Sequence, residues 1–192
     1  MKRIKTGFLL LLWMTLITGI IYPLLMTELS QILMEDEANG SLLILNDQVR
    51  GSYLLAQKFE QDKYFWVRPS AGNYQTLPST ASNLGPTSAK LKKQVEERVS
   101  LFMRKHAIKD PALIPSSMVY ASGSGLDPHI MVNSAILQLE RVAKARKLDT
   151  EEGRKKILEL ILKAKTKNSI NIFGRECINV LILNQSLDEL KT

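Results

Sequence analysis

The longest uninterrupted apolar stretch of the chain lies near its N-terminus. Residues 6–27, TGFLLLLWMTLITGIIYPLLMT, contain no Asp, Glu, Lys, Arg or His in 22 positions. A helix of this length is about 33 Å long, which is enough to cross a hydrocarbon core of about 30 Å. The run is longer than the apolar region of a cleaved signal peptide, and no small-x-small cleavage site follows it. The pattern therefore predicts an uncleaved transmembrane helix over residues 6–27.

Beyond this span, shorter apolar runs alternate with turn residues. Residues 28–40 are predicted to form a stalk that ends in the turn Asn39-Gly40, and residues 41–192 a small α+β domain. Two apolar runs around Asn46-Asp47 are typical of a β-hairpin. The stretch 63–87, which is rich in Pro and Gly, is predicted to be loop apart from one short aromatic run.

Three helices and a strand are predicted in the second half of the chain. Apolar residues recur at intervals of three and four over 87–105 and 133–147, which is the spacing of an amphipathic helix. A third helix is predicted to begin after Thr150, whose hydroxyl can cap the helix ahead of two glutamates. The run CINVLILN, residues 177–184, has no polar face, and its length favours a central strand that buries Cys177.

Charges on the two sides of the apolar run predict its orientation. Lys2, Arg3 and Lys5 precede the run, and Glu28 and the acidic group 35–37 follow it. By the positive-inside tendency, residues 1–5 are cytoplasmic and the α+β domain is extracytoplasmic. We therefore expect a single-pass protein of the cell (inner) membrane.

The overall charge gives little information about partners. The formal net charge is +7 for 192 residues. Three of these charges belong to the cytoplasmic end, and the remaining excess of +4 is too small to indicate nucleic acid. Within the span, Thr15 and Gly19 form a small-xxx-small pair that lets another helix approach closely, so they are candidate partner contacts.

The loop ASGSGLDPHI, residues 121–130, is the stretch most suggestive of chemistry. Ser122, Ser124, Asp127 and His129 are residue types of a hydrolase triad, but the G-x-S-x-G elbow is missing. A phosphate cradle is disfavoured because Pro128 lacks an amide and no Lys or Arg lies between Lys109 and Arg141. We predict a packed turn whose two glycines permit positive φ, with Asp127 as a cap and Pro128 opening a helical turn. A membrane-anchored hydrolase remains an alternative.

Motifs for energy coupling and ion conduction are missing from the sequence. It contains no G-x-x-x-x-G-K-[ST] phosphate loop and no T-V-G-Y-G potassium filter. The two histidines and the single cysteine lack the spacing of a metal site. We therefore expect no catalytic residue, no metal and no intrinsic cofactor in this chain.

Seven motifs occur in this chain in the same order as in a known protein family. The chain resembles the C subunit of the Kdp-type potassium-transporting ATPase in NGSLL, GSYLLAQKF, YFWVRPSA, SNLGPT, ASGSGLDPHI, ERVAKAR and NVLILN. These motifs are spread over a span of about 145 residues. The chain departs from the family pattern at Ala56, at Ser88 and at Met131-Val132, and the last change moves the expected helix start to Asn133.

The resemblance implies a small single-span subunit of an ATP-driven potassium uptake complex. Its expected partners are a P-type ATPase subunit, a potassium-channel-like subunit and a possible further small single-span subunit. Family descriptions also imply a catalytic chaperone that raises the ATPase subunit's affinity for ATP, so ATP is expected only through that subunit. The implied contact is a glycine-rich signature before SNLGPT, where this chain has Ser79-Thr80-Ala81, and Ser82 and Asn83 are the candidate nucleotide contacts.

A role in assembly is the other open interpretation. In it the outer domain stabilises the complex over the potassium entrance. Arg68, within YFWVRPSA, is either an ordinary surface or helix-end arginine or an anchor for a partner carboxylate or backbone group. Ser122, Ser124, Asp127 and His129 are then candidate partner contacts on a shaped loop.

Overall fold

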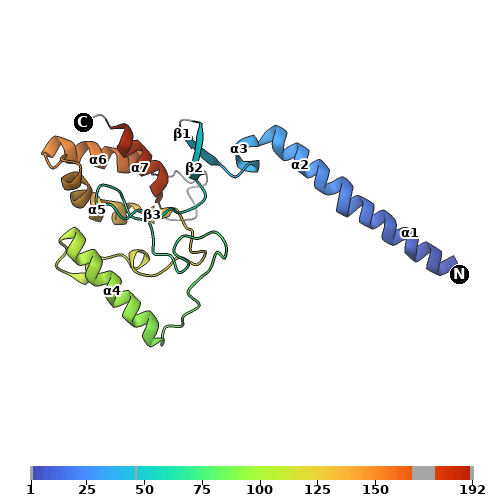
Figure 1. Cartoon of the computed structure of the whole chain (residues 1–192), viewed down its shortest axis with the longest axis horizontal. Coiled ribbons are helices and arrows are strands. Elements are labelled where there is room, and N and C mark those ends of the chain that lie inside the picture. The colour runs from blue at the N-terminus through green and yellow to red at the C-terminus, as the bar shows by residue number, and fades with distance from the viewer. Residues whose placement is uncertain (1, 46, 166–175, 191–192) are drawn as a thin grey trace. The chain divides into compact units, whose positions relative to one another are not determined.

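Helices and short strands form two compact units, Met1–Ser52 and Tyr53–Thr192 (Figure 1). The computed structural model describes residues 2–45, 47–165 and 176–190. The mixture of helix and sheet confirms the predicted α+β class. In chain order the elements are α1 (Lys2–Leu16), η1 (Ile17–Ile21), α2 (Tyr22–Leu33), α3 (Glu35–Ala38), β1 (Leu42–Leu45), β2 (Gln48–Ser52), α4 (Ala89–His106), η2 (Pro111–Leu113), η3 (Ser116–Met118), β3 (His129–Met131), α5 (Val132–Ala145), α6 (Glu151–Lys163), β4 (Cys177–Asn179) and α7 (Val180–Glu189).

The first unit contains a long apolar helix. α1, η1 and α2 follow one another from Lys2 to Leu33, and none of their described residues is buried. In the described ranges this is the one helix long and apolar enough to cross a membrane. It extends beyond the predicted 6–27 because the polar flanks continue the helix as far as Met34, where φ is −149°. Most of the predicted stalk is thus helical.

A π-helical segment interrupts the long helix just before its proline. In η1 the hydrogen bonds reach five residues back, and the amide of Tyr22 donates to the carbonyl of Ile17. Pro23 follows directly and has no amide to donate to the preceding turn. The missing donor accounts for the local widening at this position.

The predicted hairpin is present in the first unit. β1 and β2 pair antiparallel, with Leu45 opposite Gln48 and an irregularity between Leu43 and Ile44. Asp47 has a φ of +57°, which a tight two-residue connection requires, while Asn46 lies outside the described residues. The expected turn before the hairpin is also present, and Gly40 adopts a φ of +87° there.

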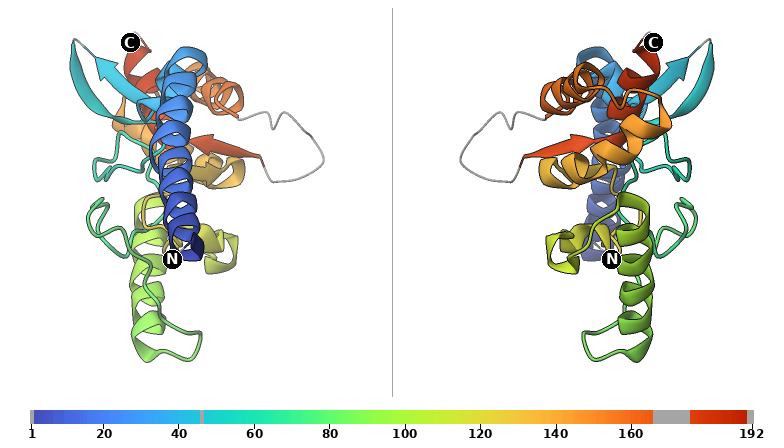
Figure 2. Two further views of the ribbon diagram at one scale, coloured as in Figure 1. Left: turned by 90° about the vertical axis from the view of Figure 1, so that its right-hand side faces the viewer. Right: turned by 90° about the vertical axis from the view of Figure 1, so that its left-hand side faces the viewer.

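The core of the second unit is built from α5, α6 and α7 and the small β3–β4 sheet (Figure 2). α5 begins at Val132, one residue before the predicted start. α6 begins as predicted, and the Thr150 hydroxyl accepts a hydrogen bond from the Gly153 amide at 3.1 Å. The buried apolar residues of the three helices include Ala135, Leu139, Val142, Ile157, Ile161, Leu183 and Leu187.

α4 confirms the predicted amphipathic helix and lies apart from α6 and α7 (Figures 1 and 2). Ser88 caps it by accepting a hydrogen bond from the Leu91 amide at 3.3 Å. Of the predicted apolar stripe, Phe102 is buried, whereas Leu91, Val95 and the other members are only half-buried. α4 therefore keeps much of its surface exposed.

The prediction of a strand over residues 177–184 is wrong for most of its length. β4 covers only Cys177–Asn179 and pairs antiparallel with β3. The Asn179 side chain then accepts hydrogen bonds from the amides of Leu181 and Ile182, which starts α7. The run lacks a polar face because its strand and helix parts are mostly buried and its one exposed residue, Ile182, is apolar. Cys177 itself is half-buried rather than buried.

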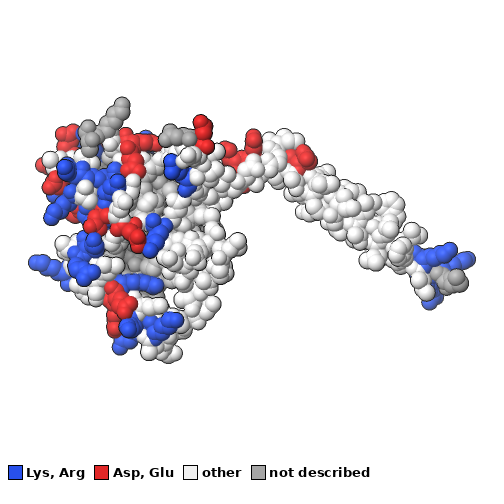
Figure 3. Space-filling model, in the orientation of Figure 1, with Lys and Arg blue, Asp and Glu red and all other residues white. Residues whose placement is uncertain are grey.

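Charged side chains are distributed differently in the two units. On the long helix Lys2, Arg3 and Lys5 lie at the N-terminal end, and the next charged residue is Glu28. Figure 3 shows the uncharged surface between these two ends. On the face of the second unit drawn there, basic and acidic side chains are intermixed. The side of the membrane on which this unit lies stays a prediction.

Candidate functional site

The glycine loop, residues 121–130, is packed against several other segments of the second unit. The Ser122 amide donates to the Pro69 carbonyl at 3.0 Å, and the Ser79 hydroxyl donates to the Ser124 carbonyl at 2.6 Å. Gly125 has a φ of +73°, and a Cβ built there would lie 2.6 Å from the Thr80 carbonyl oxygen. Only a glycine fits this close approach. The loop is a packed turn, as predicted. It touches Ser79 and Thr80, in the segment where the family resemblance implies a glycine-rich nucleotide signature.

The expected roles of Asp127 and Pro128 at a helix start are wrong. Asp127 Oδ1 accepts a hydrogen bond from the His129 amide at 3.0 Å, and this turn leads into β3 instead of a helix. The Pro128 carbonyl accepts from the Val180 amide at 2.9 Å, which holds the chain extended beside β4. The pairing with a distant segment therefore outweighs the local preference of Asp-Pro for a helix start. Of the two glycines expected to use positive φ, Gly125 does so and Gly123 does not.

Arg68, Asp127 and His129 form a linked group on the surface of the second unit. Arg68 Nη1 lies 2.7 Å from Asp127 Oδ2, and His129 Nδ1 lies 3.4 Å from Asp127 Oδ1. Hydrogen bonding by His129, and then the ion pair with Arg68, lower the pKa of the Asp127 carboxyl to about 2. The carboxylate is therefore charged at neutral pH. Arg68 is partly buried, with 27% of its side chain exposed, and is not a freely solvated surface arginine.

The serines of the loop have structural contacts. Ser122 is buried, and the Ser124 hydroxyl accepts a hydrogen bond from the Leu126 amide at 3.1 Å. Within the described ranges neither hydroxyl hydrogen-bonds to His129. A nucleophile–base pair needs such a contact, so the residues that suggested a hydrolase are not arranged as a triad.

Four candidate residues remain: Ser82, Asn83, Thr15 and Gly19. Among the described residues, no hydrogen bond joins any of them to the glycine loop. Asn83 is exposed, with a φ of +51°, and Ser82 is half-buried beside it. Thr15 and Gly19 are exposed on the helix of the first unit, where a Cβ at Gly19 would touch only Thr15 Cγ2, at 3.9 Å. That helix face is open to a close neighbour. Their roles as nucleotide or partner contacts stay predictions.

A pocket of about 490 Å³ opens beside the Arg68–Asp127 pair. Residues from η3 and the turn after it form one wall, and β3 and β4 form another. No sequence motif marks the first of these walls, because its serines and tyrosine belong to no recognisable pattern. The lining residues are Arg68, Ser116, Ser117, Tyr120, Asp127, His129, Ile130, Met131 and Cys177.

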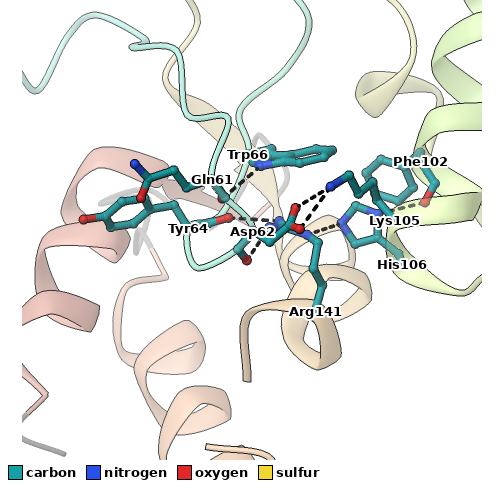
Figure 4. Close-up of polar contacts among 8 residues, drawn as sticks. All are labelled: Gln61, Asp62, Tyr64, Trp66, Phe102, Lys105, His106 and Arg141. Atoms are coloured by element: carbon teal, nitrogen blue, oxygen red, sulfur yellow. Dashed lines mark hydrogen bonds and ion pairs between the residues drawn. The ribbon is translucent and has the colours of Figure 1, made fainter. Parts of the chain in front are cut away.

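A second polar cluster, which sequence reasoning missed, surrounds Arg141 (Figure 4). Arg141 is on α5 and only 7% exposed. Its Nε donates to His106 Nε2 at 3.0 Å, and its Nη2 donates to the Tyr64 carbonyl at 2.9 Å. Nη1 donates to the Asp62 carbonyl, and the guanidinium carbon lies 4.3 Å from the centre of the Trp66 ring. One buried cation thus joins α5 to α4 and to the aromatic segment, residues 64–68, with the residues just before it.

His106 accepts a hydrogen bond in this cluster because it is uncharged. Its Nδ1 lies 2.9 Å from the Phe102 carbonyl, so the proton on Nδ1 leaves Nε2 free to accept from Arg141. Burial lowers the pKa of His106 to about 4. Burial also lowers the pKa of Arg141, to about 10, and the guanidinium stays charged at neutral pH.

Side-chain amides complete the support of the aromatic segment, residues 64–68. The Phe65 amide donates to Asn184 Oδ1 at 2.8 Å, and the Trp66 amide donates to Gln138 Oε1 at 2.7 Å. Asn184 returns a hydrogen bond to the Phe65 carbonyl at 3.0 Å. These contacts satisfy buried backbone groups in a segment that belongs to no sheet. They fix the stretch of chain that carries Arg68 to the pocket.

The described residues have no group of three or more His, Cys, Asp or Glu side chains placed to hold a metal ion. The polar groups that converge are a guanidinium, hydroxyls and an imidazole around a single carboxylate. Such a set can bind and orient an acceptor, but it does not contain an activated nucleophile. These groups are suited to recognising a polar partner.

Comparison with known proteins extends over nearly the whole chain. The family described as "K+-transporting ATPase, c chain" matches residues 4–189. A protein of Serratia proteamaculans (strain 568) is 44% identical over 195 residues, covering 100% of both chains. One of Leptospira interrogans is 42% identical, covering 96% of this chain and 93% of its own, and one of Mycobacterium bovis (strain BCG / Pasteur 1173P2) is 39% identical, covering 98% and 99%. All three are described as "Potassium-transporting ATPase KdpC subunit".

Proposed function

The chain belongs to the KdpC family of potassium-transporting ATPase subunits, and from this premise we propose that it is a non-catalytic assembly subunit. In this role the second unit binds and stabilises the P-type ATPase and potassium-channel-like subunits. The long helix packs against membrane helices of the same complex, with Thr15 and Gly19 at the contact. The proposal includes a further small single-span subunit as a neighbour in the complex.

The observation that carries the assembly role is the way the glycine loop uses its polar groups. Asp127 is engaged by Arg68 and by His129, and Gly125 fits closely against Thr80. These contacts hold a surface in a fixed shape, which is what a protein interface requires. They leave no nucleophile–base pair among the loop residues.

The alternative is a chaperone that raises the ATP affinity of the ATPase subunit by contacting the nucleotide. The loop gives this role little support, because its amides are largely occupied. The amides of Gly125, Leu126 and His129 donate within the loop. A phosphate at this position would find few free donors of the kind that a nucleotide cradle provides.

We also propose that the second unit lies outside the cytoplasm. The three cations at the N-terminal end of the long helix favour the cytoplasmic side. The acidic residues at its other end, Glu35, Asp36 and Glu37, do not oppose translocation. Under this topology a contact between the second unit and cytoplasmic ATP does not occur.

The experiment that separates the two roles uses the assembled pump. The ATPase and channel-like subunits are expressed with and without this chain, and purified in detergent. For an assembly subunit, its omission reduces recovery of the intact complex, and the complex that remains has an unchanged KM for ATP. A raised KM with normal assembly would instead support the nucleotide-binding role.

A further inference from the structure

The pocket beside Arg68, which we call the Arg68 pocket, presents more hydrogen-bond donors than its own acceptors can use. Arg68 Nη1 is bound to Asp127, but Arg68 Nε and the Ser117 hydroxyl are buried and have no partner among the described residues. Tyr120 is 45% exposed, and the structure gives its hydroxyl no hydrogen bond within the same ranges. A buried donor without a partner destabilises a fold by about 1–3 kcal/mol.

Charge in the pocket points to the kind of group that fits it. Asp127 is the one carboxylate in the lining, and both of its oxygens are already engaged. Arg68, Ser117 and Tyr120 therefore line a pocket of about 490 Å³ in which no second carboxylate is available to them. A planar carboxylate matches the fork of an arginine better than a spherical anion does.

We propose that the Arg68 pocket binds an Asp or Glu side chain of another subunit of the potassium pump. The carboxylate accepts hydrogen bonds from Arg68, Ser117 and Tyr120 after rotation of the serine hydroxyl about χ1. The Met131 side chain and the Tyr120 ring give the aliphatic stem of the acidic residue an apolar wall. This inference rests on the proposed assembly function and names the surface through which it acts.

The wall opposite Arg68 provides a test that leaves the Arg68–Asp127 ion pair intact. The double variant Ser117→Ala/Tyr120→Phe removes two donors, and its melting temperature is expected not to fall, because neither hydroxyl has a partner to lose. The full-length chain in detergent is titrated against the purified complex of the other subunits. We expect its Kd to rise about tenfold, whereas Ser100→Ala on exposed α4 leaves the Kd unchanged.

A cross-linking experiment identifies the ligand. The lysine introduced by Tyr120→Lys is coupled to nearby carboxylates with a zero-length carbodiimide in the assembled complex. Mass spectrometry is expected to find it joined to an Asp or Glu of another subunit, and the control Ser100→Lys is expected to give no such product.

Two outcomes separate the inference from the function on which it rests. If the double variant binds within twofold of the unchanged chain, or if the lysine at position 120 couples only within its own chain, the Arg68 pocket is not the interface. If the unchanged chain itself fails to bind the other subunits, the assembly function is overturned as well.

Discussion

Replacing Arg141 with Met is expected to weaken the second unit more than any surface substitution. The change keeps an apolar stem in the buried position but removes the cation that joins α4, α5 and the aromatic segment. His106 Nε2 and the carbonyls of Asp62 and Tyr64 lose their donor. The contact with the Trp66 ring is lost as well.

The size of the effect follows from these contacts. Three acceptors that lose a buried donor contribute about 1.5 kcal/mol each, and the ring contact about 1 kcal/mol. Relief of the desolvation of the buried charge offsets about 2.5 kcal/mol of this loss. The net expectation is a decrease of about 3 kcal/mol in the free energy of unfolding.

Urea unfolding of the full-length chain in detergent measures this decrease. Trp13→Phe leaves Trp66, which contacts Arg141, as the only fluorescent tryptophan. Arg146→Met is the matched control, because Arg146 also donates to backbone carbonyls and lies over a ring, that of Tyr64, but Arg146 is half-buried and its ion-pair partner Asp188 is exposed. The control is expected to lose about 1 kcal/mol. Equal losses for the two variants would refute the central position given to Arg141.

Two further predictions concern the same unit. His106 binds a proton near pH 6.5 when unfolded but near pH 4 when folded. Its contribution to the free energy of unfolding is therefore fully present above pH 6.5 and is lost as the pH drops towards 4. The free energy of unfolding at pH 5 should be about 2 kcal/mol lower than at pH 7.5, and His106→Gln should flatten this dependence; an unchanged slope in that variant would assign it to other groups. Gly125→Ala should lower stability by about 2 kcal/mol, since φ is +73° and the new Cβ meets the Thr80 carbonyl, while Gly123→Ala, with no neighbour within 4 Å, should change it by less than about 0.5 kcal/mol. Similar melting temperatures for the two alanine variants would contradict the close fit of the loop.

Elements with a strong local pattern could be predicted from the sequence. The long apolar helix, the hairpin and the starts of α4 and α6 depend on uninterrupted apolar runs, on spacing and on capping residues close in sequence. Ser88 and Thr150 act as caps within three residues of themselves. Such signals require no knowledge of the rest of the fold.

The failures have a common physical cause in distant contacts. Residues 180–184 resemble a strand because all of them except Ile182 are buried and Ile182 is itself apolar. The helix start depends on the side chain of Asn179. The Asp127-Pro128 pair leads into a strand because the Val180 amide binds the Pro128 carbonyl. Nearly complete burial, and pairing between residues far apart in the sequence, leave no periodic signal.

The candidate site was predictable only in part. Arg68 and the glycine loop were singled out, and the structure joins them through Asp127. The Arg141 cluster was missed because Arg141 contacts His106 and Asp62, which are 35 and 79 residues away. Ser117 and Tyr120 likewise enter the pocket through a turn that has no sequence signature.

The central claim, an assembly surface outside the cytoplasm, is tested most directly by labelling single cysteines in cells. In a Cys177→Ser background, Ser100→Cys places a thiol on the exposed face of α4, and Lys5→Cys places one before the apolar span. A membrane-impermeant maleimide should label position 100 in intact cells and position 5 only after lysis. Labelling of position 5 in intact cells, with position 100 protected until lysis, would contradict the claim and return the glycine loop to the ATP side of the membrane.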